Sequence, residues 1–249
     1  MTVPRRTVPL RSTCGRPHPC TPAMQLRILG QIGIFAGLTE NDLAGIGDRA
    51  ESLSWAAGEA LFNAGEDPEH VYLLAAGQAK SFRTTTSGQR TGLDFLGPGD
   101  VFGNLTGPAL AGYDETAVAL TTTCALRLDT GAFRAVMLAL PSVALAVLDV
   151  VSNRLLRART REQEQTTADL TERVVASLLS LAENFGVPGD EPGSTLIQLP
   201  LSRTDLAAMT GTSAESVSRV MSRLRADGLI DSGRRWTAVL DRAGLLAAK

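Results

Sequence analysis

The chain has 249 residues, is 44% hydrophobic and carries a formal net charge of −2. It is long enough to bury a substantial core, in one large domain or in two ordinary ones. No apolar run approaches the roughly 20 residues that a membrane helix needs, and the basic start is not followed by an apolar segment. The sequence therefore argues against a membrane protein and a secretory signal. Three cysteines, an odd number, favour a reducing cytoplasmic compartment over a disulfide framework.

The start of the chain is basic and poor in apolar residues. It reads MTVPRRTVPLRSTCGRPHPC, with several arginines and no acidic residue. No apolar segment follows it. We therefore expect residues 1–29 to form a flexible arm that carries cysteine and histidine.

Short apolar stretches separated by glycines fill residues 30–136. Between Ser52 and Arg127 glycine recurs every few residues, which is typical of turns between short strands. The stretch TTSGQRT predicts a hairpin, because Gly88 can take the positive φ that a tight turn needs. The pattern indicates an antiparallel barrel or sandwich.

The pattern changes to a helix within residues 137–167. The stretch PSVALAVLDVVSNRLLRARTREQEQ has no glycine and begins with proline, which the first helical turn tolerates. Apolar side chains spaced by three and four residues predict a seam along this helix. The seam consists of Ala144, Leu148, Val151, Leu155 and Ala158. The other faces before Leu156 are also apolar, so the helix is expected to meet a second subunit; the alternative is a helix buried within one domain.

Residues 168–249 have the pattern of a winged helix-turn-helix. One helix ends at Gly186, and a second begins at Ser202, which has an acid three residues on. After a turn at Gly211, Ser213 caps a third helix, and two short strands follow around Ser232. The inward residues of the third helix are expected to be Val217, Val220, Met221 and Leu224. From residue 201 onward basic residues outnumber acidic ones, which suits a nucleic-acid module.

This order of parts resembles the bacterial CRP/FNR superfamily, typified by the cyclic-AMP receptor protein and the fumarate–nitrate regulator. The resemblance runs from about Ile34 to Leu246 and is carried by GEALFNAGE, GPGDVFGNL and LSRTDLAAMTGTSAESVSRVMSRLRADGLI. It implies an α+β fold with an N-terminal double-stranded β-helix (a cyclic-nucleotide-binding-like β-roll), a long dimerisation helix and a C-terminal winged helix-turn-helix. The implied function is a sequence-specific transcriptional regulator. It would bind a palindromic operator in double-stranded DNA as a homodimer, and would contact RNA polymerase if it is an activator.

The resemblance also implies which side chains meet DNA. Glu215, Ser218 and Arg219 share one face of the recognition helix. Arginine pairs with guanine through two hydrogen bonds, and glutamate accepts one from cytosine. The spacing E-x-x-S-R matches the fumarate–nitrate branch and implies a TTGAT-like half-site. The residues expected to contact phosphates are Ser202, Arg203, Ser213, Arg223 and Arg235.

The sensor region departs from the cyclic-AMP pattern. Asn104 stands where that branch has a ribose-binding glutamate, and Glu115-Thr116 stand where it has Arg-Ser. No basic residue lies between Gly103 and Leu126. A phosphate buried opposite carboxylates without a cation is unfavourable, so we expect no cyclic AMP to bind.

The cysteines suggest a different signal. Cys14, His18 and Cys20 lie in one short segment, and Cys124 falls near the end of the predicted β-roll. In the oxygen-sensing branch, cysteines at similar places hold an iron–sulfur cluster, and an imidazole can replace a thiolate in some clusters. This chain has two N-terminal cysteines rather than three, so His18 or a carboxylate would be the fourth ligand. Two alternatives stay open: Cys124 as a small buried hydrophobe, and haem or an organic ligand as the signal.

A competing function is a redox or metal-binding protein whose winged domain contacts other proteins. It predicts no salt-dependent DNA binding. An enzyme is not expected, because the sequence has no nucleophile elbow, no phosphate-binding loop and no catalytic pairing of its two histidines with carboxylates.

Overall fold

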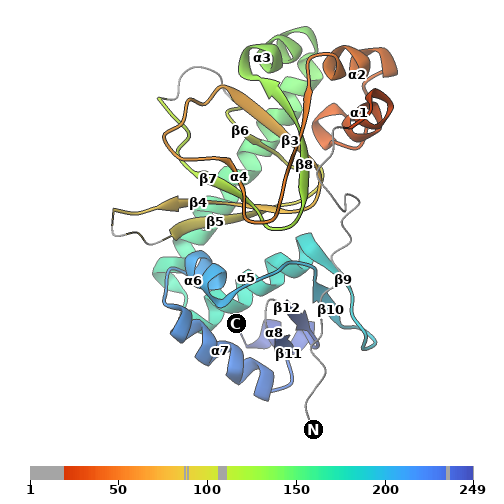
Figure 1. The fold of residues 1–249 in the computed structure, drawn as a ribbon. Coiled ribbons are helices and arrows are strands. Elements are labelled where there is room, and N and C mark those ends of the chain that lie inside the picture. The colour runs from red at the N-terminus through yellow and green to blue at the C-terminus, as the bar shows by residue number, and fades with distance from the viewer. Residues whose placement is uncertain (1–19, 87, 89, 106–110, 234–235, 249) are drawn as a thin grey trace. The chain divides into compact units, whose positions relative to one another are not determined.

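The computed structural model describes residues 20–86, 88, 90–105, 111–233 and 236–248. These divide into two compact units, and each is described here by itself (Figure 1). The first, the sensor unit, comprises 20–84 and 94–157, and the second, the reader unit, comprises 158–248 together with 85–93. The boundary at 157/158 falls inside helix α4 (Pro141–Thr167).

Two four-stranded sheets form the β-roll, which belongs to the sensor unit except for residues 85–93 at the β4–β5 hairpin. The first has the order β1-β8-β3-β6 and contains β1 (Glu51–Trp55), β8 (Thr123–Asp129), β3 (His70–Ala76) and β6 (Val101–Gly103). The second has the order β2-β7-β4-β5 and contains β2 (Ala60–Phe62), β7 (Thr116–Ala119), β4 (Ala79–Thr84) and β5 (Arg90–Leu96). Together with the helices, these sheets confirm the predicted α+β class and the β-roll.

Two glycines of the roll are required by its geometry. Gly88 lies between β4 and β5 with φ of +80°, as the hairpin prediction requires. Gly77 has φ of +82°, and a Cβ there would lie 2.2 Å from the carbonyl oxygen of Thr122. Any side chain at Gly77 would therefore force the neighbouring strand away.

Helices α1 (Pro22–Leu29), α2 (Glu40–Gly47) and α3 (Thr130–Ala139) also belong to the sensor unit. The expectation of a flexible arm as far as residue 29 is wrong for α1. Thr21 caps this helix by accepting a hydrogen bond from the Met24 amide, and Pro22 occupies the first turn. Leu29 is fully buried, so apolar burial together with the cap orders this segment.

One face of α4 contributes to the hydrophobic core of the sensor unit. Val143 and Val147 pack in one cluster with side chains of the first sheet and of α3. The members of that cluster from the first sheet and α3 include Val71, Leu73, Val101, Leu126, Leu128 and Phe133. Each fully buried valine contributes about 1.5–3 kcal/mol, so the start of α4 is held firmly within this unit.

The reader unit combines helices α5 (Leu170–Phe185), α6 (Arg203–Thr210), α7 (Ala214–Ala226) and α8 (Arg242–Ala247) with one sheet. The sheet has the order β11-β12-β10-β9 and contains β11 (Ile230–Gly233), β12 (Trp236–Val239), β10 (Thr195–Ile197) and β9 (Gly186–Pro188). The winged helix-turn-helix is thus confirmed. Strands β9 and β10 flank the segment 189–194 and extend the wing sheet to four strands.

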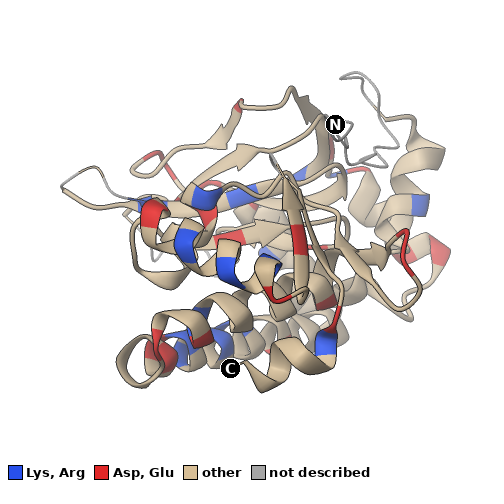
Figure 2. Ribbon diagram, turned by 90° about the horizontal axis from the view of Figure 1, so that it is seen from below, with Lys and Arg blue, Asp and Glu red and all other residues tan. Residues whose placement is uncertain are grey.

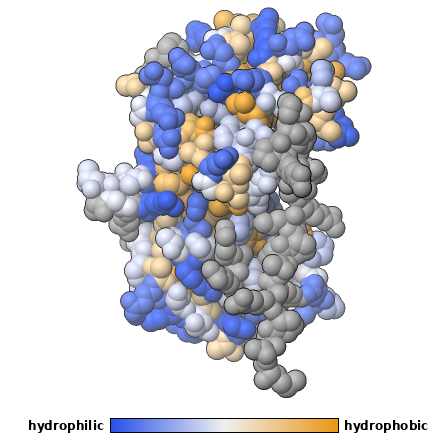
Figure 3. Space-filling view, in the orientation of Figure 1, coloured by the Kyte–Doolittle hydropathy of each residue, from blue (hydrophilic) through white to orange (hydrophobic). Residues whose placement is uncertain are grey.

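The surface carries charges of both signs. Figure 2 shows basic and acidic residues interspersed along the ribbon rather than gathered by sign. The face in Figure 3 is largely hydrophilic, with smaller hydrophobic patches between the polar residues. Figure 2 therefore does not indicate the binding face from charge alone.

Within the described residues, no single helix has the length and apolar character to cross a membrane, and α3 with α4 would do so only as a pair bent by 117°.

Candidate nucleic-acid interface and sensor site

The helix-turn-helix is defined by its caps. The Ser202 hydroxyl accepts a hydrogen bond from the Asp205 amide at 3.1 Å, and the Asp205 carboxylate accepts one from the Ser202 amide. Helix α6 ends at Thr210 and is followed by Gly211 in the left-handed conformation, with φ of +66°. Ser213 then caps α7 by accepting from the Ser216 amide. These local contacts fix the sharp turn between the two helices.

Helix α7 has a buried face and an exposed face, as the sequence predicts. The buried side chains are Val217, Val220, Met221 and Leu224. On the outer side, the Glu215 and Arg219 side chains are 81% and 68% exposed. The Arg219 guanidinium donates to the Glu215 carboxylate at 2.8 Å and to the Ser216 hydroxyl at 3.0 Å. The two predicted base-reading side chains are therefore neighbours and accessible, and an exposed pair of this kind is worth about 0–1 kcal/mol.

Ser218, the third predicted base-reading residue, is only half-buried but already has a partner. Its hydroxyl donates to the Ala214 carbonyl one turn earlier, at 2.7 Å. A hydroxyl bonded in this way retains lone pairs and must rotate before it can donate to a base.

The predicted phosphate contacts have different surroundings. Ser202 and Ser213 act as caps, as described above. Arg203 is half-buried and donates to the Ser232 hydroxyl of the wing strand at 2.9 Å. Burial lowers the pKa of Arg203, and the nearby Arg225 charge lowers it further. Arg223 donates to the Thr171 hydroxyl of α5. Arg235 lies outside the described residues.

Helix α4 exposes an apolar stripe in the described structure. Of the predicted seam, Leu148, Val151, Leu155 and Ala158 are exposed, and Ala144 is half-buried. The exposed fractions are 59% for Leu148, 38% for Val151 and 53% for Leu155. The prediction missed two further members of the stripe, Leu145 and Leu156, which are 64% and 60% exposed. So large a stripe is unusual on a surface that contacts only water.

Aromatic side chains fill part of the interior of the β-roll. The rings of Phe62 and Tyr113 stack with centroids 4.1 Å apart, and the Tyr72 and Phe102 rings stack at 5.4 Å. Phe62 also lies 5.4 Å from Tyr72, so the four rings form one cluster. The Tyr113 hydroxyl donates to the His70 carbonyl at 3.1 Å. This cluster joins β2, β3 and β6 to the segment before β7.

The residues at the family's nucleotide-binding positions make other contacts. Asn104 is 1% exposed, and its side-chain amide donates to the Pro68 carbonyl at 2.6 Å. Asp114 forms an exposed ion pair with Arg83 of β4. Burial raises the pKa of the half-buried Glu115, and a hydrogen bond with Ser81 offsets part of that rise. These positions therefore present carboxylates and an engaged amide to any ligand.

Glu115 gives the sensor unit a pH dependence that can be measured. Because its pKa in the folded chain is raised, the folded state holds the proton more tightly, and stability falls as pH rises from about 4.5 through the folded pKa. A Glu115→Gln variant is expected to have a higher urea midpoint at pH 7, with the gain shrinking toward pH 4. Asp114→Asn, at the neighbouring exposed carboxylate, is the control and should change the midpoint much less. Equal gains at both pH values would contradict the assignment.

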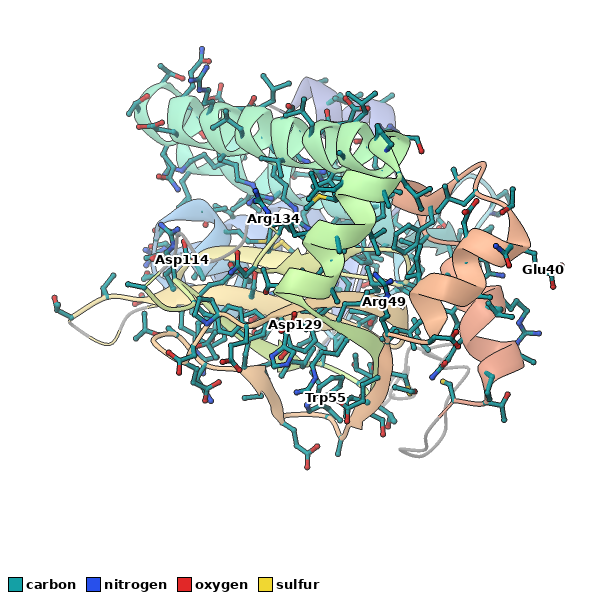
Figure 4. All side chains as sticks on the ribbon, turned by 90° about the horizontal axis from the view of Figure 1, so that it is seen from above. Glu40, Arg49, Trp55, Asp114, Asp129 and Arg134 are labelled. Atoms are coloured by element: carbon teal, nitrogen blue, oxygen red, sulfur yellow. The ribbon has the colours of Figure 1, made fainter. Side chains whose placement is uncertain are left out.

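A pocket of about 490 Å³ lies where β8 meets α3. Its lining includes the carboxylates Asp67, Glu69 and Asp129 and one cation, Arg134. Asp129 ends β8 and Arg134 belongs to α3, whereas Asp114 precedes β7 and does not line the pocket; all three are labelled in Figure 4. The pocket and the Asp114 edge are therefore separate surfaces of the sensor unit.

The predicted metal ligands are only partly described. Cys14 and His18 lie outside the described residues, whereas Cys20 is half-buried and Cys124 is buried. The Cys20 amide donates to the Ser52 hydroxyl at 2.9 Å, and Cys124 stands opposite Ser54 in the β1–β8 register. Because Ser52 and Ser54 point to the same face of the sheet, the fold brings both cysteines to one region. No cluster of three or more possible metal ligands occurs among the residues that the structure describes.

Comparison with known proteins agrees with both units. Residues 52–139 match the cyclic nucleotide-binding domain model, and residues 172–248 match the Crp-like helix-turn-helix domain model. The cyclic AMP receptor protein of Thermus thermophilus is 31% identical over 186 residues, covering 75% of this chain and 82% of that protein. This chain belongs to the CRP/FNR family of transcriptional regulators. Its sensor unit is the family's signal-sensing domain, and its reader unit is the DNA-binding domain.

Other CRP/FNR proteins are similar over most of their length. The CRP-like cAMP-activated global transcriptional regulator of Mycobacterium tuberculosis is 27% identical over 195 residues, covering 78% of this chain and 86% of that protein. The structure of FixK2 from Bradyrhizobium japonicum has a TM-score of 0.71 and 26% identity, and covers 80% of this chain and 97% of that one. The resemblance inferred from the sequence motifs is therefore confirmed.

Proposed function

We propose that this CRP/FNR regulator works in the cytoplasm as a homodimer on a palindromic operator, with one α7 in the major groove of each half-site. The accessible Glu215 and Arg219 at the start of α7 carry this proposal, because recognition helices read bases with their N-terminal residues. Arg219 pairs with a guanine and Glu215 accepts from a cytosine. Ser218 supports this contact once its hydroxyl turns away from Ala214.

The phosphate contacts position α7 without reading sequence. Ser202 and Ser213 stand at helix starts, where amides and hydroxyls meet phosphate oxygens. Arg203 holds the wing strand β11 in place through its hydrogen bond to Ser232, and its positive charge attracts the phosphates of DNA. Arg223 and Arg235 complete the set that we propose. If the protein is an activator, RNA polymerase is a further partner.

The dimer is supported by the apolar stripe of α4. Its inner face is covered by the sensor core through Val143 and Val147, whereas the stripe formed by Leu145, Leu148, Val151, Leu155 and Leu156 is exposed in the single chain. A second copy of α4 covers this stripe with matching apolar side chains, as in a two-stranded coiled coil. The two-fold axis then matches the symmetry of a palindrome.

The signal that we propose is a metal or redox signal rather than a cyclic nucleotide. Three carboxylates line the pocket of the sensor unit, and Glu115 and Thr116, next to Asp114, occupy the positions of the phosphate-binding pair. Carboxylates outnumber the single cation of the pocket, Arg134, so burying a phosphate there is unfavourable. Cys20 and Cys124 lie against the same face of the sheet and are the first candidates for thiolate ligands of iron, with Cys14 and His18 completing the set. Iron content and absorption spectrum of protein purified without oxygen test this part, and an iron-free, colourless protein contradicts it.

DNA binding is tested by selection from a random duplex pool with the purified chain. We expect a two-fold-symmetric sequence to be enriched, with affinity falling steeply as salt rises because several phosphates are neutralised. If no sequence is enriched and binding is insensitive to salt, the winged domain mediates protein contacts and the alternative function holds.

A further inference from the structure

A corner between α4 and α5, residues 165–171, is joined to the helix-turn-helix by side-chain contacts. The Arg173 guanidinium donates through Nη1 to the Ala168 carbonyl at 2.8 Å and through Nε to the Thr210 carbonyl at 3.1 Å. Ala168 directly follows α4, and Thr210 is the last residue of α6. One planar side chain thus connects the end of the long helix to the turn before the recognition helix.

Arginine suits this position for a geometric reason. The last carbonyls of a helix lack partners within the helix, and Thr210 is such a residue. The rigid guanidinium fork satisfies two carbonyls at once and fixes the angle between them. A lysine has a single flexible ammonium and would not fix that angle.

Two more contacts strengthen the same corner. Arg223 of α7 donates to the Thr171 hydroxyl in the first turn of α5. The Gln165 side chain of α4 lies against the turn, because a Cβ at Gly211 would be 3.5 Å from its Nε2 atom. Side-chain contacts from α4, α5, α6 and α7 therefore meet at this corner.

The recognition helix is also connected to Asp169, the cap of α5. Hydrogen bonding with the Glu172 amide lowers the pKa of Asp169, and the Arg223 charge lowers it further. The start of α5 thus carries a negative charge near the C-terminal half of α7. This charge favours the same relative placement of α5 and α7 as the Arg223–Thr171 hydrogen bond.

From these contacts we infer that Arg173 is a positioning residue for DNA recognition: it makes the helix-turn-helix and the end of α4 move as one body. The inference rests on the proposed homodimer on a palindrome. In that assembly the distance between the two recognition helices is set by the distance between the C-terminal ends of the two α4 helices. Arg173 transmits this distance, because it bonds the residue after α4 to the last residue of α6. A bend between α4 and α5 is then resisted, so changes in spacing arise N-terminal to residue 165.

The test measures how the intact dimer tolerates operator spacing. Wild-type protein and Arg173→Met are titrated against the selected palindrome, against the same palindrome with one base pair added or removed at its centre, and against a single half-site. Wild type is expected to prefer its own spacing by tenfold or more, on the order of the energy of two hydrogen bonds involving a charged group. In Arg173→Met this preference should fall about threefold or more, while half-site affinity stays within about threefold.

Three variants separate positioning from general damage. Arg242→Met removes an exposed guanidinium that contacts Glu183 in the same unit, and should leave the spacing preference unchanged. Thr171→Val removes the Arg223 contact and the hydroxyl's hydrogen bond to Asp169 but leaves Arg173 in place, and should reduce the preference less than Arg173→Met. Arg173→Lys keeps the charge without the fork and should resemble Arg173→Met.

The outcomes distinguish failure of the inference from failure of the proposed function. Arg173→Met overturns the inference if it keeps the wild-type spacing preference, or if it weakens half-site and full-site binding equally. If wild type itself selects no palindrome, the proposed function has failed before the variant is considered.

Discussion

An Arg219→Ala dimer is expected to bind its operator roughly 30-fold to 10⁴-fold more weakly than wild type. Each half-site loses one two-pronged guanine contact worth about 1–3 kcal/mol, and the dimer has two half-sites. Little of this loss is offset by the broken pair with Glu215, because both side chains are mostly exposed. The measurement is competition between operators that differ at a single base pair. The variant should no longer distinguish guanine from the other bases at one position in each half-site.

Arg219→Lys separates base reading from charge. It keeps the positive charge, so the dependence of affinity on salt should stay close to that of wild type. It lacks the planar fork, so discrimination at the guanine should still be lost. Arg225→Ala is a control on the same helix, because Arg225 pairs with Asp231 of the wing. If Arg219→Ala weakened binding to every sequence by the same factor, Arg219 would be a phosphate contact.

The reader unit could be predicted in detail because its signals are local. The Ser202–Asp205 cap, the left-handed Gly211 and the Ser213 cap each depend on residues within four positions. The pairing of Glu215 with Arg219 follows in the same way from spacing along one helix. Caps and turns of this kind can be predicted from the sequence, because their signals lie in adjacent residues.

Contacts between distant segments could not be predicted from the sequence. The charge of Arg203 and its place at the start of α6 suggest a phosphate contact. In the structure its guanidinium donates to the hydroxyl of Ser232, which is 29 residues away in the sequence. Arg173 shows no sequence signal at all, and its contact with Thr210 depends on how α5 packs beside α6. Strands β9 and β10 are three residues each, too short for an alternating pattern; β10 pairs with the edge of β12, and β9 pairs with β10.

The stripe on α4 shows an intermediate case. Spacing by three and four identified Leu148, Val151 and Leu155, but it left out Leu145 and Leu156. Spacing by three and four picks out only a narrow line of side chains along a helix. The apolar stripe that α4 exposes is wider than this line. The sequence alone could not decide which apolar face the sensor core covers. Burial of Val143 and Val147 decides it.

Leu148→Glu is expected to split the dimer and to reduce operator binding to the level of a single half-site. The two-fold axis places both substituted side chains in one interface, and each buried, unpaired carboxylate costs several kcal/mol. We therefore expect the dimer dissociation constant to rise by about 10³-fold or more. The mass measured by sedimentation equilibrium should fall to that of one chain at concentrations where wild type is a dimer.

Asn153→Glu is the matched control for this change, because it adds the same charge to an exposed position of α4 away from the seam. At 100° per residue, Asn153 lies about 140° around the helix from Leu148, so its carboxylate stays in water. It should remain dimeric and bind the operator like wild type. Since Leu148 is mostly exposed in the single chain, Leu148→Glu should also keep the wild-type unfolding midpoint of the monomer. A Leu148→Glu protein that stays dimeric would mean that the stripe meets some other surface, and the two recognition helices would then have no shared axis to match a palindrome.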